Sequence, residues 1–349
     1  MGATPGRKPH ATQPVVDPRR RAIVGRMIRP DILVAAPMPL AVMAALDARF
    51  TAHRLWELGG ADALPPTTRD AIVGIAANTL AGQIDSRLFD RLPHLQIVAN
   101  FGVGYDNVDA RAAAERGVIV TNTPGVLDAE VADLTVGLLL ATIRRIPQAD
   151  RYVREGRWAT QPFPLSATLQ GRQIGILGLG AIGKAIARRL AAFDLAIAYC
   201  GRHRQPDVPY AYFPDARSLA QACDVLIVIV PGGDATTHLV DRPVLTALGP
   251  QGVLINVSRG SVVDEEALIA ALQDGTIAAA GLDVYVNEPH VPAALIAMAN
   301  VVLLPHVGSG SVATRAAMGQ LVVDNLIAWF TQGKPLTPVA ESRHLPGAV

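Results

Sequence analysis

The sequence GLGAIG at positions 178–183 constrains the fold of this chain more than any other feature. It follows the apolar run QIGIL and leads into the amphipathic stretch AIGKAIARRLAAF. In such a strand–turn–helix unit the first glycine permits a tight turn, the second lets the backbone approach a pyrophosphate, and the third lets helix and strand pack closely. The pyrophosphate then meets the unpaired N–H groups and positive end of the helix. The motif therefore predicts a dinucleotide site that includes Gly178, Leu179, Gly180, Ala181, Ile182 and Gly183.

The residues after the next strand-like run predict which dinucleotide binds. A unit of this kind normally ends its second strand on an acidic residue that holds the ribose hydroxyls. Here the run AIAYC is followed by Gly201, Arg202 and, two residues on, Arg204. A carboxylate would repel the 2′-phosphate of NADP, whereas arginines offer planar donors that match a phosphate. We therefore expect NADP (NADPH) as cofactor; the alternative is that these arginines only solvate a loop.

Short apolar runs alternate with amphipathic segments along the rest of the chain, as in parallel α/β sheets. A first series comprises DILVAAP, AIVGIAA, LQIVAN and GVIVT, and a second series of six runs begins at Arg172. A helix expected over 311–333 has no strand left to follow, so we expect it to return to the first series. The pattern predicts an α/β protein with doubly wound parallel sheets in two domains. These are a flavodoxin-like substrate domain, residues 27–124 and 310–339, and an NADP-binding Rossmann domain, residues 125–309, inserted in it.

Composition and charge narrow the function classes. Half of the 349 residues are hydrophobic and the net charge is +1, so we expect neither nucleic acid nor a membrane as partner. No apolar run approaches the ~20 residues that a membrane span needs. Cys200 and Cys223 can form no disulfide framework and have no metal-ligand spacing, so no metal is expected. Residues 1–26 are basic and lack an apolar stretch, which favours a disordered extension on a cytoplasmic protein, with a transit peptide as the alternative.

Ionisable side chains occur at the ends of three late strand-like runs. Arg259 follows VLINV, Asp283 and Glu288 lie at and beyond the end of AAAGLDV, and His306 follows VVLLP. In open α/β sheets, ligands bind outside the carboxyl ends of the strands. We therefore expect these side chains at the sheet edge that also carries the glycine motif.

The motifs G-x-G-x-x-G, V-S-R-G, N-E-P and P-H-V-G-S follow one another in an order that is similar to that of the D-isomer specific 2-hydroxyacid dehydrogenases. Within that family the sequence most resembles the NADPH-dependent glyoxylate/hydroxypyruvate reductases, over about residues 31 to 338. The resemblance implies an oxidoreductase that reduces a small 2-oxo acid to the D-2-hydroxy acid by hydride transfer from NADPH, in a cleft between two domains. It also implies a homodimer held by the cofactor domain, and the apolar excess of a helix expected over 129–146 favours the same assembly.

The resemblance implies roles for individual residues. Arg259 would orient the substrate, His306 would contact it and donate the proton, and Glu288 would be the partner of His306. Backbone N–H groups of Val103 and Gly104 resemble a loop that binds the substrate carboxylate. The implied cofactor contacts beyond the glycine motif are Gly201, Arg202, Arg204, Val230, Pro231, Thr237, Val257, Ser258, Asp283, Gly308 and Ser309, with Asp283 holding the nicotinamide carboxamide.

Two alternatives remain at this point. One is a reductase of the same family that acts on 2-ketogluconate or an arylpyruvate, because loop side chains decide the acyl group. The other is a binding protein of the same fold, similar to transcriptional corepressors that sense a dinucleotide. Turnover of NADPH with glyoxylate separates an enzyme from such a binding protein.

Overall fold

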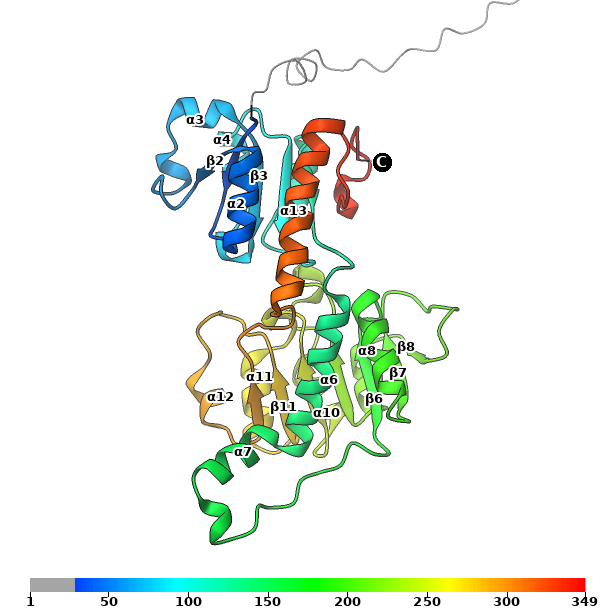
Figure 1. Cartoon of the computed structure of the whole chain (residues 1–349). Coiled ribbons are helices and arrows are strands. Elements are labelled where there is room, and N and C mark those ends of the chain that lie inside the picture. The colour runs from blue at the N-terminus through cyan, green and yellow to red at the C-terminus, as the bar shows by residue number, and fades with distance from the viewer. Residues whose placement is uncertain (1–28, 349) are drawn as a thin grey trace, which may run out of the picture.

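The computed structural model describes residues 29–348, whose strands form two parallel sheets in two stacked units (Figure 1). The extension expected over residues 1–26 lies outside the described residues. The first unit holds a five-stranded sheet of order β2-β1-β3-β4-β5, the strand order of flavodoxin-like folds. Its strands are β1 (Asp31–Val34), β2 (Thr51–Arg54), β3 (Ile72–Asn78), β4 (Ile97–Phe101) and β5 (Ile119–Thr121), and its helices are α2 (Leu40–Arg49), α3 (Pro66–Ala71), α4 (Ser86–Arg91) and α5 (Ala110–Glu115).

The inner strands of this sheet are almost entirely buried, since helices cover both faces. Four of its five strands correspond to the apolar runs of the sequence, and β2 does not. The sequence of β2, TAHR, contains no apolar run, because this edge strand pairs with β1 alone and keeps its side chains partly exposed. An edge strand of this kind lacks the pattern by which buried strands are recognised.

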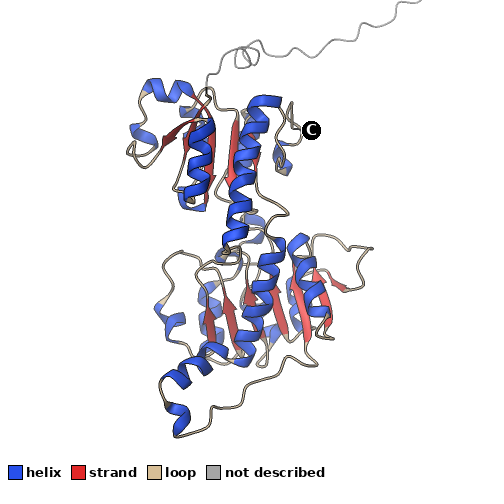
Figure 2. Cartoon of the chain, viewed as in Figure 1, coloured by secondary structure: helices blue, strands red, loops and turns tan. Residues whose placement is uncertain are grey.

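The second unit holds a seven-stranded sheet of order β12-β11-β10-β9-β6-β7-β8. The order reverses between β6 and β9, and such a switch point is where doubly wound sheets bind dinucleotides. Six strands match the apolar runs; β8 was not expected, because it has three partly exposed residues. The strands are β6 (Gln173–Leu177), β7 (Ala196–Cys200), β8 (Ala211–Phe213), β9 (Val225–Val228), β10 (Val253–Asn256), β11 (Ala279–Leu282) and β12 (Val301–Leu303), flanked by helices α8 (Ala181–Ala191), α9 (Ala216–Gln221), α10 (Arg242–Leu248), α11 (Glu265–Gln273) and α12 (Ala293–Ala297) (Figure 2).

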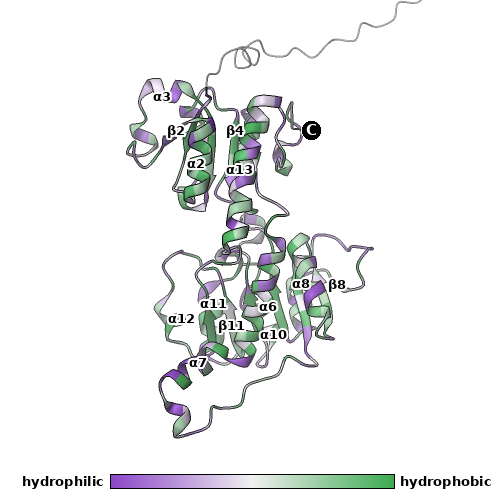
Figure 3. Cartoon of the chain, viewed as in Figure 1, coloured by the Kyte–Doolittle hydropathy of each residue, from purple (hydrophilic) through white to green (hydrophobic). Residues whose placement is uncertain are grey.

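The helix expected over 129–146 is divided into α6 (Asp128–Arg144) and α7 (Ile146–Arg154). The break lies at Arg145, whose φ of 54° ends α6, and α7 then starts with Pro147 in its first turn. Apolar residues of α6 that include Val131, Leu138 and Leu139 are buried within the chain, where the helix packs on α8 and β11. Leu134, Val136 and Leu140 of α6 stay half-buried, and apolar side chains that are more exposed follow at Ile146, Val153, Trp158 and Leu165. Figure 3 shows hydrophilic and hydrophobic residues mixed along α7.

Helix α13 (Val312–Gln332) packs against β4 and α2 of the first unit. Its side chains Met318, Val322, Leu326 and Trp329 share one core with Ile32 of β1 and other residues of the first sheet. The chain then continues along this unit, where Val339 donates a backbone hydrogen bond to Val120. Segments from both ends of the described chain therefore build the first unit, with the second unit between them in sequence (Figure 1).

Candidate active site

The glycine motif forms the turn between β6 and α8, at the switch point of the second sheet. Gly178 has a φ of +106°, and a Cβ there would lie 2.4 Å from the carbonyl oxygen of Ile229, just past β9. A Cβ on Gly183 would lie 2.2 Å from the carbonyl oxygen of Gly178, so the third glycine lets α8 pack on the turn. These close approaches explain why neither position tolerates a side chain.

The middle glycine of the motif faces open space. A Cβ on Gly180 would meet no atom within 4 Å, and Gly180 is the N-cap of α8 without any side-chain hydrogen bond to the first turn. Free N–H groups at a helix N-terminus with room in front of them suit an anion. The turn therefore fits the pyrophosphate of a dinucleotide.

The segment after β7 carries the positive charges expected beside the ribose. Arg202 and Arg204 are exposed, and a Cβ on Gly201 would come no closer than 4.0 Å to another residue. The backbone of Gly178 donates a hydrogen bond of 2.9 Å to the carbonyl of Cys200, which keeps the end of β7 beside the glycine turn. The structure therefore brings these basic side chains to the edge of the dinucleotide site without an acidic residue at 201.

The other expected cofactor residues also follow the ends of strands. Val230 and Pro231 follow β9, and the Val230 side chain lies 2.8 Å from where a Gly178 Cβ would stand. Thr237 donates its hydroxyl to the Gly233 carbonyl in the same loop. Val257 and Ser258 are buried after β10, and Gly308 and Ser309 follow β12.

His306 and Glu288 form a hydrogen-bonded pair, with 2.6 Å between the imidazole Nδ1 and the carboxylate Oε2. The second oxygen of Glu288 accepts a hydrogen bond of 3.1 Å from the Tyr285 backbone. Burial alone would raise the pKa of the Glu288 carboxyl, but the hydrogen bond and charge of His306 outweigh burial and leave this pKa lowered. Glu288 is therefore held as a carboxylate, and the Nε2 atom of His306 remains free to exchange a proton.

Asp283 anchors the loop that presents His306. Its two carboxylate oxygens accept hydrogen bonds of 2.8 Å from the backbone N–H groups of Val307 and Gly308, and its carbonyl accepts one from His306. Burial raises the pKa of this carboxyl, and the N–H of Val307 and the charge of His306 offset part of the rise. A contact with the nicotinamide carboxamide stays a prediction, because the protein itself already uses both oxygens.

Arg259 reaches from the second unit to the first. Its Nε donates a hydrogen bond of 2.9 Å to Asp106, and its Nη1 donates one to the Ser258 carbonyl. The remaining nitrogen, Nη2, lies against Gly104, where an added Cβ would stand only 1.8 Å from it. Arg259 and the Val103–Gly104 loop are both expected to contact the substrate, and the structure brings the Arg259 guanidinium onto this loop.

Sequence reasoning missed Asp106 and Tyr285. Asp106 lies 153 residues from Arg259 in the chain, so no local pattern indicates the ion pair. The available signal is weak: an acid two residues after the Val103–Gly104 loop. Tyr285 contributes its backbone N–H to Glu288, and that contact depends on the turn and not on the side chain.

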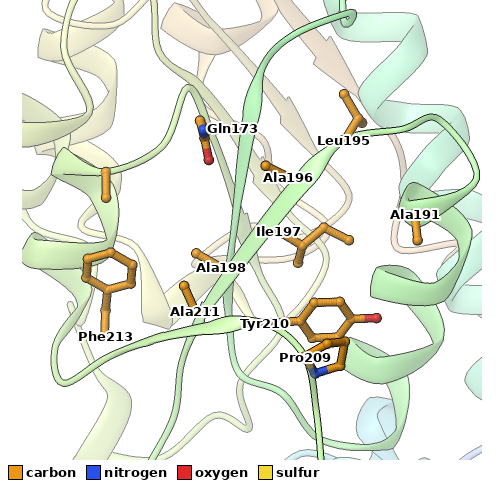
Figure 4. Close-up of a pocket in the computed structure, with 11 residues that line it drawn as sticks. Gln173, Ala191, Leu195, Ala196, Ile197, Ala198, Pro209, Tyr210, Ala211 and Phe213 are labelled. Carbon is orange, nitrogen blue, oxygen red and sulfur yellow. The ribbon is translucent and has the colours of Figure 1, made fainter.

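A separate hollow of about 680 Å³ lies between β6, β7 and β8 (Figure 4). Its lining includes Gln173 and Ala196, the first residues of β6 and β7, so it opens at the end of the sheet opposite the glycine turn. Most lining side chains are apolar, and Tyr210 is the only ionisable one among them. This hollow therefore offers no groups for acid–base chemistry.

Two features are absent from residues 29–348. No helix in this range combines the length and the apolar character needed to cross a bilayer. Within the same range, no three His, Cys, Asp or Glu side chains gather in a way that could hold a metal ion.

A glycine turn at the switch point of a Rossmann sheet and a His–Glu pair at the same edge define a dinucleotide-dependent oxidoreductase. The model of the D-isomer specific 2-hydroxyacid dehydrogenase NAD-binding domain matches residues 136–308. Glyoxylate/hydroxypyruvate reductase A of Arabidopsis thaliana is 47% identical over 308 residues, which cover 88% of this chain and 98% of the relative. Hydroxyphenylpyruvate reductase of Plectranthus scutellarioides is also 47% identical, with 88% and 98% covered.

A solved structure that is similar to this chain is also that of a reductase. The NADPH-dependent glyoxylate/hydroxypyruvate reductase of Sinorhizobium meliloti, in complex with NADP and malonate, superposes with a TM-score of 0.86 at 53% identity. The match covers 90% of this chain and 98% of that one. This chain belongs to the D-isomer specific 2-hydroxyacid dehydrogenase family.

Proposed function

We propose that this protein reduces glyoxylate or hydroxypyruvate to the corresponding D-2-hydroxy acid with NADPH. The observation that carries the proposal is the His306–Glu288 pair, whose Nδ1–Oε2 distance is 2.6 Å, at the same sheet edge as the glycine turn. The names of the relatives from Arabidopsis and Sinorhizobium support the same reaction.

In this proposal the chain provides the proton, and NADPH, when bound, provides the hydride for the keto carbon. Negative charge then grows on the carbonyl oxygen, and His306 donates a proton to it through Nε2. Glu288 orients the imidazole through its hydrogen bond with Nδ1. After the transfer His306 is neutral and takes up a proton from solvent before the next turnover.

Arg259 and the Val103–Gly104 loop bind the substrate carboxylate in this proposal. Nη2 of Arg259 lies at Gly104, so the guanidinium and the loop N–H groups can hold one carboxylate between them. The same positive charge stabilises the developing charge on the carbonyl oxygen. The five-stranded unit is then the substrate-binding domain and the seven-stranded unit the cofactor domain.

The preference for NADPH is assigned to the segment after β7. Gly201 leaves space beside the ribose, and Arg202 and Arg204 are exposed cations free to meet a 2′-phosphate. The Sinorhizobium relative is NADPH-dependent by name and holds NADP in its structure, which supports this assignment. We further assign Thr237, Val257 and the other expected residues at the strand ends to cofactor binding.

Initial rates with a panel of 2-oxo acids test the proposal. We expect glyoxylate and hydroxypyruvate to be turned over with NADPH at higher kcat/KM than 2-ketogluconate or hydroxyphenylpyruvate. Hydroxyphenylpyruvate belongs in the panel because a relative of equal identity is named for it. A higher kcat/KM for the aryl substrate would reassign the substrate class, and absence of turnover with tight NADPH binding would favour a dinucleotide-sensing protein.

A homodimer and a cytoplasmic location complete the proposal. The exposed side chains Ile146, Val153, Trp158 and Leu165 form an apolar segment on the cofactor unit that a second copy would cover. The location is proposed from cysteine usage: the sequence has two cysteines, and both are free and buried.

A further inference from the structure

The loop after β7 carries three exposed basic residues at its tip. Arg202, His203 and Arg204, the basic tip, are all exposed, and within residues 29–348 their side chains form no hydrogen bond or ion pair. The position of this tip is therefore set by the residues on either side of it.

Two tyrosines anchor the backbone on both sides of the basic tip. The hydroxyl of the fully buried Tyr199 accepts a hydrogen bond of 2.6 Å from the backbone N–H of Gln205. The hydroxyl of Tyr212 donates to the carbonyl of Gly201 over 3.4 Å. The two rings lie on the paired strands β7 and β8 with their centroids 5.4 Å apart, so the anchors belong to the sheet.

The side chain of Gln205 forms a third hydrogen bond, which connects the loop after β7 to the glycine turn. Its Nε2 donates a hydrogen bond of 2.9 Å to the carbonyl of Leu179. Leu179 is the second residue of the glycine turn and is buried. One side chain thus connects the basic tip to the turn that fits a pyrophosphate.

We propose that Gln205 is a positioning residue for cofactor selectivity: it sets the spacing between the basic tip and the glycine turn. The inference rests on the proposed use of NADPH. One NADP molecule presents its 2′-phosphate and its pyrophosphate on the two sides of a single ribose, so their separation is limited by covalent geometry. A loop already held at the matching spacing loses less conformational freedom when both phosphates bind.

The test compares three ligands by calorimetric titration of the parent, Gln205→Ala and Gln221→Ala. NADP⁺ carries both groups, NAD⁺ carries only the pyrophosphate, and 2′-AMP carries only the phosphate that the basic tip would bind. Gln221 is an exposed glutamine at the end of α9 and serves as the matched control. We expect Gln205→Ala to weaken NADP⁺ by about fivefold, the equivalent of one net hydrogen bond, and to change NAD⁺ and 2′-AMP by less than about twofold.

Other outcomes overturn the inference. An equal loss for 2′-AMP and NADP⁺ would mean that Gln205 contacts the phosphate directly, and an equal loss for all three ligands would mean general damage to the turn. Thermal melting of each variant checks folding. Tyr199→Phe, which removes the acceptor for the Gln205 N–H, should reproduce the selective loss of NADP⁺ affinity; unchanged affinities in both variants would rule out a positioning role.

The same titrations separate this inference from the proposed function. A parent protein that binds NADP⁺ no more tightly than NAD⁺ contradicts the proposed cofactor preference itself. A parent with a strong preference that Gln205→Ala leaves intact contradicts only the role of Gln205.

Discussion

At the scale of single residues, a substitution at position 201 tests the proposed preference for NADPH. We expect Gly201→Asp to lower kcat/KM for NADPH by at least about tenfold while NADH is retained or improved, because a carboxylate repels the phosphate and binds ribose hydroxyls. The backbone tolerates the change, since a Cβ there meets nothing closer than 4.0 Å. Initial rates with both cofactors give the ratio. Gly201→Asn is the uncharged control, and an equal effect of both variants would assign the loss to size.

A single substitution also tests the role of the Glu288 charge in catalysis. Glu288→Gln keeps the shape of the side chain but removes the carboxylate charge that lies 2.6 Å from Nδ1 of His306. We expect the pH profile of kcat for reduction to differ from the parent's, because the imidazole that donates the proton no longer lies beside a carboxylate. His306→Ala should lower kcat by ~10²–10⁴ with little effect on NADPH binding. A profile for Glu288→Gln that coincides with the parent's would remove Glu288 from the proposed mechanism.

The lowered pKa of Glu288 also links this pair to stability. A carboxyl whose pKa is lower in the folded protein than its usual value of 4.5 stabilises the fold above that pH. This contribution to stability is lost as the pH falls from 4.5 through the lowered pKa, because the unfolded chain then binds the proton more readily than the folded protein does. We expect the difference in melting temperature between the parent and Glu288→Gln to shrink over that acidic range. Melting curves from neutral to acidic pH would show a constant difference if the pair made no such contribution.

At the scale of elements, the close packing of α13 on α2 should reverse the usual effect of replacing a helical glycine by alanine. Replacing glycine by alanine inside a helix usually stabilises by about 0.5–1 kcal/mol. At Gly319 a Cβ would lie 2.1 Å from the Val42 side chain, whose branched Cβ allows little adjustment, so Gly319→Ala should lower the melting temperature. Gly137 in α6 has nothing within 4 Å, so Gly137→Ala should raise it. Changes of the same sign in both variants would contradict this account of the contact.

The elements that can be predicted from the sequence are the buried ones, because burial requires a recognisable pattern of apolar residues. The central strands are buried and mostly apolar, and the glycine turn needs glycines at its crowded positions, so both are predictable from residues alone. The edge strands β2 and β8 are short and partly exposed, and nothing in their sequences requires a strand. Arg259, Glu288 and His306 follow predicted strands, whereas Asp106 and Gln205 act through contacts that exist only after folding.

At the scale of the whole molecule, the Arg259–Asp106 ion pair connects the two units. Asp106→Ala leaves Nε of Arg259 without its partner, whereas Asp106→Asn keeps an acceptor and removes the charge. We expect the alanine variant to lose about tenfold in kcat/KM for the 2-oxo acid, with a smaller loss for asparagine and no change in KM for NADPH. Steady-state kinetics with both substrates checks this. If only the kinetic constants for NADPH became worse, Asp106 would have no role in positioning the substrate.

The proposed assembly is testable at the same scale. Trp158 and Leu165 are 68% and 99% exposed, which is costly for apolar side chains in an isolated chain. We expect the parent to sediment as a dimer at micromolar concentration and Trp158→Ser/Leu165→Ser to shift toward monomer. Leu40→Ser, at an exposed position of the first unit, is the control and should remain dimeric. A parent that sediments as a monomer would contradict the homodimer.

The shared core of α13 and the first sheet also has a consequence for synthesis. Ala348 and Trp329 are buried in the core that contains Ile32, whereas the last strand of the seven-stranded sheet ends at Leu303. On the ribosome the cofactor unit therefore emerges whole while the unit begun before it still lacks its covering helix. We therefore expect the second unit to be able to complete its fold before the first, the reverse of the usual order. Until α13 emerges, the face of the nascent five-stranded sheet that α2 and α13 share lacks the part of its cover that α13 provides.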